Sequence, residues 1–246
     1  MKDVEGMQIS SPNYSEERLL EAFVALRECP EISVSMDEVS VLSEAEGDEG
    51  VSASYIAAEM LEDAARVPAL ARVGSGLRIA EEAPRFRKIA SRWRGFAAHG
   101  ELTGEFSVPN FCRTIFEPAP PLTWEGSSEE ERRLFAEFRK IDSNPRSGTG
   151  LFSVVRLEQA ANPLGIWVWD ARAGALQMDV DYLGYLEALS LTKGTHGWQY
   201  LFTDVSLENP DFYHVANGMK RMLQVFPQYF PQHGYEDLER RLEERL

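Results

Sequence analysis

The stretch GIWVWDARAGALQMDVDYLGYLEAL, residues 165–189, decides the fold class of this chain because a strand pattern gives way to a helix pattern within it. Its first part, Gly165 to Arg172, is rich in aromatic and β-branched residues and is bounded by turn formers, as a strand requires. The ARAGA segment then closes a hairpin into LQMDVD. Beyond Asp181, a good helix N-cap, apolar residues recur at helical spacing at Tyr182, Tyr185, Leu186 and Leu189. The stretch therefore predicts an α+β protein.

Neighbouring segments extend this pattern in both directions. LFSVVRLE, Leu151 to Glu158, predicts a second strand, so a compact antiparallel sheet is expected. Ser128 and Glu131 have the capping-box spacing ahead of RRLFAEFRKI, which predicts a helix reaching Ile141. Further helices are expected from about Asp211 and over the C-terminal GYEDLERRLEERL. The predicted fold is a small antiparallel or mixed sheet flanked by several helices.

The N-terminal half is predicted to contain three helices and one strand. Ser15 can cap a helix that ends at Cys29, and EISVSMDEVSV has the alternation of a half-buried strand over 31–41. Helical spacing returns over 52–70 after an acidic loop. Residues 84–98, PRFRKIASRWRGFAA, are predicted to form a basic helix whose aromatic side chains face the core.

A proline-rich segment, FEPAPPLTWEGSS at 116–128, is the best internal boundary. It divides the chain into a polar tail over 1–14, a helical or mixed subdomain over 15–125 and an α+β subdomain over 126–246. The alternative is one continuous domain over 15–246, since 246 residues can form one large domain.

Composition points to a folded cytoplasmic protein. The chain is 43% hydrophobic, its first residues lack the apolar core of a signal peptide, and no segment has the length of a membrane span. Its two cysteines, Cys29 and Cys112, form neither a disulfide framework nor a metal motif. Reduced thiols are expected, with a single bridge between them left open.

Charge is distributed unevenly along the chain. Residues 1–63 contain 16 acidic and 3 basic side chains, within a whole-chain net charge of −15. Such a field repels nucleic acid and acidic membrane surfaces and attracts basic proteins, so neither nucleic acid nor membrane is expected as a partner. The alternative is that the acidity only keeps the protein soluble.

No known catalytic or metal-binding motif occurs in the sequence. The chain contains no nucleophile elbow, phosphate-binding loop or paired metal-ligand histidines, so we expect no catalytic residue, cofactor or metal. Asp170, Asp179 and Asp181 lie around the hairpin, where turn formation and helix capping explain Asp170 and Asp181.

The segment TKGTHGWQYLFTDV, residues 192–205, contains three groups of the kinds that form a proton relay: Lys193, His196 and Asp204. No nucleophile accompanies them. Apolar spacing from Trp198 to Val205 favours a helix over a strand here, with Gln199, Thr203 and Asp204 directed outward. We therefore interpret the segment as a helix terminus followed by packing residues.

Residues 166–205, IWVWDARAGALQMDVDYLGYLEALSLTKGTHGWQYLFTDV, resemble the C-terminal part of bacterial SUKH-superfamily proteins, many of which are immunity proteins against secreted toxins. The likeness lies in the order of an aromatic strand WVWD, a hairpin, an acidic strand end MDVD, a helix YLGYLEAL and the segment GWQYLF. It implies an α+β fold that acts by binding, with the activity residing in the partner. It carries over no functional residue.

The leading functional hypothesis is a non-enzymatic immunity-type protein that neutralises a basic toxin, such as a nuclease, by occluding its active site. The candidate partner-binding residues lie in one acidic segment: Glu38, Glu44, Glu46, Asp48 and Glu49. One alternative is an enzyme whose site assembles from distant residues such as Asp170, Asp181 and His196. Another is a regulatory or structural interaction module, with a homo-oligomer formed through the amphipathic C-terminal helix.

Overall fold

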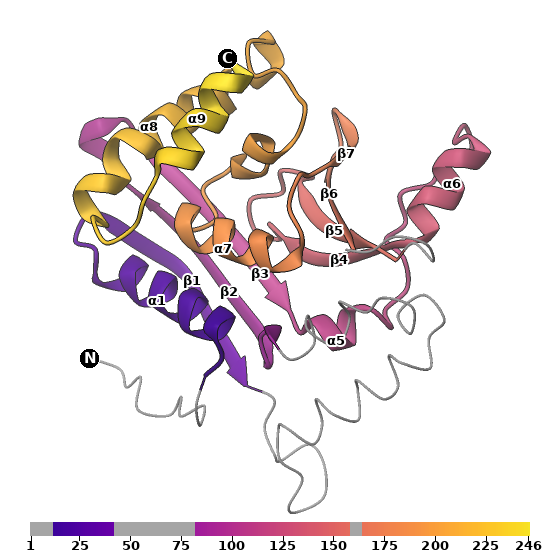
Figure 1. Ribbon diagram of the computed structural model, residues 1–246, viewed down its shortest axis with the longest axis horizontal. Coiled ribbons are helices and arrows are strands. Elements are labelled where there is room, and N and C mark those ends of the chain that lie inside the picture. The colour runs from indigo at the N-terminus through magenta and orange to yellow at the C-terminus, as the bar shows by residue number, and fades with distance from the viewer. Residues whose placement is uncertain (1–11, 42–81, 158–163) are drawn as a thin grey trace, which may run out of the picture.

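The computed structural model has the predicted α+β architecture, and its described residues form six α-helices and two small antiparallel sheets of three and four strands (Figure 1). It describes residues 12–41, 82–157 and 164–246. The helix predicted over 52–70 lies outside this range. No helix within the described residues is long and apolar enough to cross a membrane.

The three-stranded sheet has the order β1-β2-β3 and the four-stranded sheet the order β4-β5-β6-β7. The strand bounds are β1 Ile32–Val41, β2 Phe86–Gly95, β3 Leu102–Pro109, β4 Phe138–Ser143, β5 Phe152–Arg156, β6 Gly165–Asp170 and β7 Gly174–Gln177. Every pairing within the sheets is antiparallel. The strands and the hairpin of the opening stretch are thus confirmed.

Helices lie on and between the sheets, and α7 occupies the centre of the molecule (Figure 1). The α-helices are α1 Tyr14–Glu28, α5 Phe111–Thr114, α6 Glu129–Ala136, α7 Tyr182–Thr192, α8 Tyr213–Tyr229 and α9 Glu236–Arg245, with short 3₁₀ helices at Ala97–His99 (η2), Trp198–Phe202 (η3) and Pro210–Phe212 (η4). Asp181 caps α7 as predicted, since its carboxylate accepts from the Gly184 amide at 2.8 Å.

The segment predicted as a basic helix over 84–98 is instead the central strand β2, so that prediction is wrong. Its large apolar residues are buried as expected: Phe86, Ile89, Trp93 and Phe96. Their spacing fits a helix, but β2 pairs with β1 on one side and β3 on the other. Two ladders of backbone hydrogen bonds between distant segments outweigh a local helical pattern.

The helix predicted to reach Ile141 is shorter than expected. Ser128 and Glu131 form the capping box that starts α6, but the helix ends at Ala136. Phe138 and Ile141 then lie on β4, which pairs with β5. Both residues are buried, as their apolar pattern predicts, but the helical conformation predicted for them is wrong.

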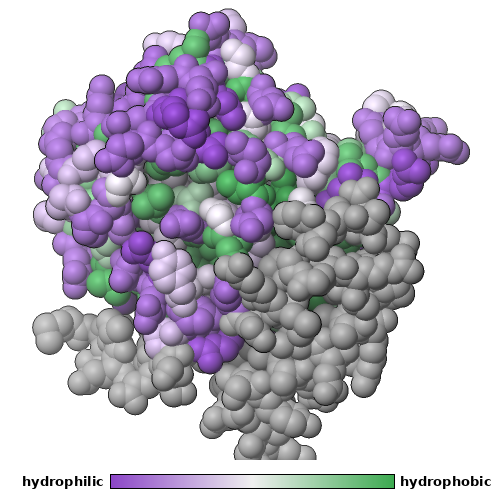
Figure 2. Space-filling view, viewed as in Figure 1, coloured by the Kyte–Doolittle hydropathy of each residue, from purple (hydrophilic) through white to green (hydrophobic). Residues whose placement is uncertain are grey.

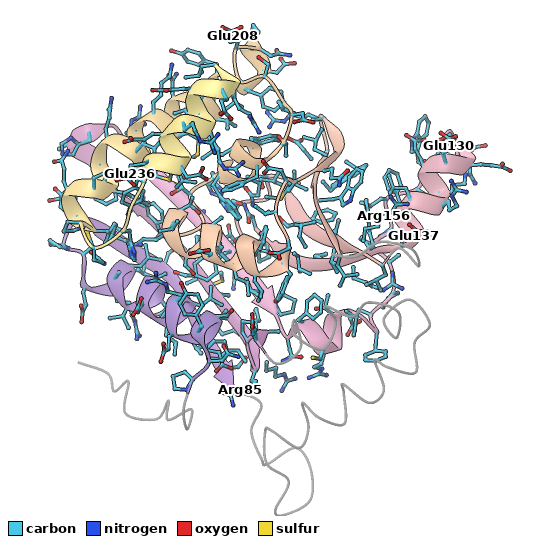
Figure 3. All side chains as sticks on the ribbon, in the orientation of Figure 1. Arg85, Glu130, Glu137, Arg156, Glu208 and Glu236 are labelled. Atoms are coloured by element: carbon cyan, nitrogen blue, oxygen red, sulfur yellow. The ribbon has the colours of Figure 1, made fainter. Side chains whose placement is uncertain are left out.

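The first helix begins at Tyr14 with Asn13 as its N-cap, two residues before the cap predicted at Ser15. The Glu16 side chain is fully buried and accepts hydrogen bonds from both Asn13 and Arg85. Figure 3 shows Arg85 near the start of β2. This buried ion pair ties α1 to the three-stranded sheet.

One continuous cluster of buried side chains runs from Leu19 on α1 to Leu242 on α9 and includes residues of both sheets. The buried Asp142 carboxylate on β4 accepts from the Ser107 amide on β3 and from the Tyr185 hydroxyl on α7, each at 2.7 Å. The two sheets and α7 therefore meet at one buried carboxylate. Cys29 and Cys112 are buried free thiols.

Candidate functional site

The chain that follows α7 covers the free edge of β3. Thr195 forms an antiparallel bridge with Gly104. The Glu105 amide donates to the Gly194 carbonyl at 2.9 Å, and the His196 amide donates to the Thr103 carbonyl at 3.0 Å. Residues 194–196 thus act as a short extra strand, which fixes the position of the imidazole that follows.

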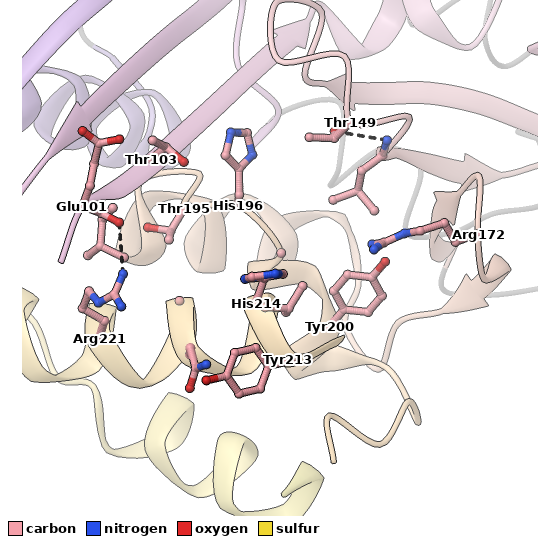
Figure 4. A pocket seen from close by; sticks show the side chains of 16 residues that line it. Glu101, Thr103, Thr149, Arg172, Thr195, His196, Tyr200, Tyr213, His214 and Arg221 are labelled. Atoms are coloured by element: carbon pink, nitrogen blue, oxygen red, sulfur yellow. Dashed lines mark hydrogen bonds between the residues drawn. The ribbon is translucent and has the colours of Figure 1, made fainter. Parts of the chain in front are cut away.

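This extra strand forms one wall of a cavity of about 490 Å³, a size typical of small-molecule sites. The rest of the lining comes from β3, from the turns before β5 and β7, and from η3 and α8. Its main polar side chains are Arg172, His196, Tyr200, Tyr213, His214 and Arg221 (Figure 4). The segment interpreted as packing residues from sequence therefore also contributes to a cavity.

His196 is held in the cavity wall by Asn144. The orientation of the Asn144 amide that satisfies all its neighbours places its nitrogen 3.3 and 3.1 Å from the carbonyl oxygens of Ser143 and Glu105 and its oxygen 3.2 Å from Nδ1 of His196. Nδ1 then carries the proton and Nε2 has a free lone pair. Burial lowers the pKa of His196, so the ring is neutral at physiological pH and can accept a hydrogen bond.

Asp170 supports a second part of the wall. Its buried carboxylate accepts hydrogen bonds from the Tyr200 hydroxyl and from Nε and Nη2 of Arg172. Although burial opposes ionisation, these bonds hold the pKa of Asp170 below its usual range. The carboxylate is therefore ionised and fixes the positions of one guanidinium and one phenol at the cavity.

Arg221 on α8 forms the opposite end of the cavity. Its Nη1 donates to the Glu101 carbonyl at 3.1 Å. Its guanidinium packs directly against Gly100, where a Cβ atom would lie only 2.8 Å from Cζ. Gly100 also has a φ of +81°, which favours glycine. The guanidinium is thus positioned by backbone groups.

Of the three residues considered for an assembled enzyme site, only His196 is among the described residues that line this cavity. Asp170 supports two lining residues. Asp181 instead caps α7. Asp179, at the other end of the hairpin, pairs with Arg241 at 2.7 Å. The three aspartates therefore serve separate structural contacts.

The relay considered for Lys193, His196 and Asp204 is not assembled. Lys193 is fully buried, with Nζ 3.4 Å from the Ser190 carbonyl and 4.2 Å from the centroid of the Phe230 ring. Asp204 is exposed. Lys193 therefore belongs to the core and to the end of α7, where it adopts a left-handed φ of 51°.

Replacing Lys193 with methionine should raise the free energy of unfolding by about 2–3 kcal/mol at pH 7. Burial lowers the pKa of Lys193 from 10.5 to about 8, so the folded state binds the proton less tightly than the unfolded chain. Wild-type stability should therefore rise between about pH 8 and pH 10.5, and the advantage of methionine should shrink over that interval.

Guanidinium chloride unfolding at pH 7 and pH 10.5 measures this difference. The same substitution at the exposed Lys220 should change stability by less than about 0.5 kcal/mol. A Lys193→Met protein less stable than wild type at pH 7 would show that the aromatic contacts of the ammonium outweigh its desolvation.

Of the predicted partner-binding residues, only Glu38 lies within the described part of the chain. It is on β1 and pairs with Lys88 on β2 at 2.8 Å. Glu44, Glu46, Asp48 and Glu49 lie outside the described residues. The described ranges therefore place one of the five carboxylates, and it already has a cationic neighbour.

A different acidic surface stands out in the structure. Residues 124–136, here called the acidic arm, comprise an exposed turn and α6, and they project from the body of the molecule (Figures 1 and 2). Trp124 is 71% exposed at the turn. The exposed carboxylates of the arm are Glu125, Glu129, Glu130 and Glu131. Figure 3 shows Glu130 far from the sheet, on the projecting helix.

The turn that carries Trp124 is held in one conformation. The Trp124 amide donates to Ser127 Oγ at 3.1 Å, and Arg132 donates to the carbonyls of Ser127 and Glu125 at 2.9 and 3.0 Å. The indole lies over Gly126, where a Cβ atom would be 2.3 Å from the ring. The exposed tryptophan is therefore positioned in advance of any contact.

Sequence reasoning missed the arm and most of the cavity, and it placed two side chains on the wrong side. Gln199 and Thr203 were predicted to face outward but are 2% and 1% exposed. The reason is that Trp198–Phe202 forms a 3₁₀ helix, whose three-residue turn changes which residues share a face.

The acidic arm could have been recognised from the sequence WEGSSEEE, because it contains a single tryptophan among polar residues.

Within the described ranges, no three His, Cys, Asp or Glu side chains gather closely enough to hold a metal ion. In comparisons with known proteins, no family model, curated protein or solved structure matches the chain.

Proposed function

We propose that this protein is a non-enzymatic, immunity-type binding protein that neutralises a basic protein toxin, such as a nuclease, by covering its active site. The observation that carries the proposal is the acidic arm, which presents a highly exposed tryptophan beside a row of exposed carboxylates. A toxin that cleaves nucleic acid needs a cationic surface, and an acidic arm competes for that surface.

Two parts of the arm have separate physical roles. Glu125, Glu129 and Glu130 would steer a basic partner toward the arm, because opposite charges raise association rates. Trp124 would then supply contact area, since tryptophan is enriched among the residues that dominate binding energy. The hydrogen bonds that fix the turn reduce the entropy lost on binding.

The likeness of residues 166–205 to SUKH-superfamily immunity proteins supports the same function. In the structure this stretch contributes β6, β7 and α7; α7 lies at the centre of the molecule, and β7 is the edge strand of the four-stranded sheet. It would serve as the scaffold, while the arm and the acidic N-terminal segment would face the partner. Membership of the superfamily is part of this proposal.

Reversing the charges at Glu125, Glu129 and Glu130 to lysine should slow association with the partner about tenfold at low salt and flatten its salt dependence. The partner is first captured from the native cell on the wild-type protein and purified. Association rates are then measured for both proteins from about 20 to 300 mM salt, where screening lengths shorten severalfold. Trp124→Ala should instead mainly raise the dissociation rate.

The control carries the same three reversals on α9, at the exposed residues Glu236, Glu239 and Glu243. Its net charge equals that of the arm variant, so equal losses in both would show that only overall charge matters. Co-expression of the wild-type protein should restore growth of cells that express the partner, and the arm variant should fail to do so. An arm variant that binds and rescues like wild type contradicts the proposal.

A further inference from the structure

The cavity contains an arginine that is positioned but not neutralised. Within the described residues, Arg221 forms no ion pair, and its guanidinium is held by the Glu101 carbonyl and by packing on Gly100. Among the described lining residues Glu101 alone has a carboxylate, and Figure 4 shows it turned away from the Arg221 guanidinium. A fixed guanidinium without a counter-ion is suited to bind an anion.

A second arginine lies at the far end of the cavity. Arg172 uses Nε and Nη2 on Asp170, which leaves its Nη1 edge unused by that carboxylate. Figure 4 shows His196 and His214 between the two guanidinium groups. The Thr103 hydroxyl and the Asn217 amide also line the cavity, whereas the Thr195 hydroxyl donates to the Thr192 carbonyl at 2.7 Å. The polar groups therefore converge from several elements on one space.

Size and chemistry together indicate the class of ligand. A cavity of about 490 Å³ is larger than a single phosphate and is within the range of sites for small organic molecules. The Arg221 end offers donors to an oxyanion. The rest of the cavity offers the neutral His196 ring and the apolar faces of Tyr200 and Tyr213 to an uncharged remainder.

We propose that this cavity binds a small phosphomonoester, with its phosphate on Arg221 and its organic part extending toward Tyr200 and Arg172. This binding site is distinct from the acidic arm and does not depend on the proposed toxin partner. It gives the protein a small-molecule ligand on the side of the fold formed by α8 and the covered edge of β3.

Titration calorimetry with inorganic phosphate and with glycerol phosphate, at constant ionic strength, tests the proposal. Glycerol phosphate should bind at millimolar concentration or below and should raise the melting temperature. Arg221→Gln should weaken this binding at least tenfold, since a bidentate charged contact is lost. Lys220→Gln is the matched control, because it removes the same charge from an exposed neighbour on the same helix.

Several outcomes are distinguishable. Tighter binding of glycerol phosphate than of inorganic phosphate supports a phosphomonoester site. Equal affinities overturn the proposed contact with the organic group and show that the cavity binds phosphate alone. Absence of heat and of thermal stabilisation with both probes overturns the proposal, as does an equal loss in Arg221→Gln and Lys220→Gln. Circular dichroism of both variants shows whether they remain folded. If Arg221→Gln is unstable, Arg221→Lys replaces it in the test. Because lysine keeps the charge, Arg221→Lys should retain part of the binding.

Discussion

Replacing Asp142 with alanine should lower the free energy of unfolding by about 3–5 kcal/mol, because it removes the acceptor from a buried set of donors. The Ser107 and Ser143 amides both donate to Oδ1 at 2.7 Å, and the Tyr185 hydroxyl lies 2.7 Å from Oδ2. Asp142 is 1% exposed, so water cannot replace the lost acceptor without opening the core. Denaturant unfolding measures the loss.

The amide variant Asp142→Asn separates packing from charge. Burial, with the nearby Glu105 carboxylate, raises the pKa of Asp142 from 3.8 to about 6 despite its three donors. The folded state therefore holds the proton more tightly than the unfolded chain, and this contribution to stability is lost as pH rises through about 6. Asparagine has the same shape as aspartate but does not titrate. The free energy of unfolding of the Asp142→Asn protein should therefore increase relative to that of wild type between about pH 4 and pH 7.

A control defines the scale of these effects. Alanine at the exposed Asp204 should change stability by less than about 0.5 kcal/mol. If Asp142→Ala behaved like that control, the carboxylate would not be the junction between the two sheets. If Asp142→Asn tracked wild type at every pH, the proton would not be bound more tightly in the folded state.

Replacing Gly104 with alanine should cost about 3–5 kcal/mol, a large effect for one methyl group. Gly104 on β3 faces Trp93 on β2, and an added Cβ would lie 2.5 Å from Cε2 and Nε1 of the indole. The ring cannot move away easily, because it is buried and its Nε1 donates to the Lys193 carbonyl at 2.7 Å. The substitution would therefore disturb the strand, the indole and the end of α7 together.

A double-mutant cycle with Trp93→Phe tests this cause. The smaller ring removes the clashing atoms, so the two substitutions together should cost less than the sum of their separate costs. The same glycine-to-alanine change at Gly218 on α8, where a Cβ would meet nothing within 4 Å, should instead stabilise the protein by up to about 1 kcal/mol. Additive costs for Gly104→Ala and Trp93→Phe would contradict the proposed contact.

The fold class could be read from the sequence where the local pattern and the tertiary structure agree. In the stretch from Gly165 to Leu189, strand composition, turn residues and an N-cap all indicate the same elements. The helix predictions for the segments that form β2 and β4 were wrong for the same reason. Their aromatic residues have helical spacing, but both segments pair with other strands and form sheets. Pairing between distant strands cannot be recognised from the residues of one short stretch of sequence.

The cavity could not be predicted because its parts come from separate regions of the chain. Arg221 reaches the Glu101 carbonyl across 120 residues, and His196 reaches Asn144 across 52. Each residue alone is an ordinary polar position. His196 was considered as a candidate, but its role depends on the pairing of residues 194–196 with β3, which sequence proximity does not reveal.

The pairing of residues 194–196 with β3 also bears on whether this sheet can add a further strand at its edge. An unpaired sheet edge is a template for strand addition and aggregation. On one edge of the three-stranded sheet residues 194–196 pair with residues 103–105 of β3, and β1, at the other edge, has two register irregularities and the charged residues Asp37 and Glu38. Within the described residues neither edge of this three-stranded sheet offers a regular uncharged ladder, so addition of a partner strand to this sheet is disfavoured.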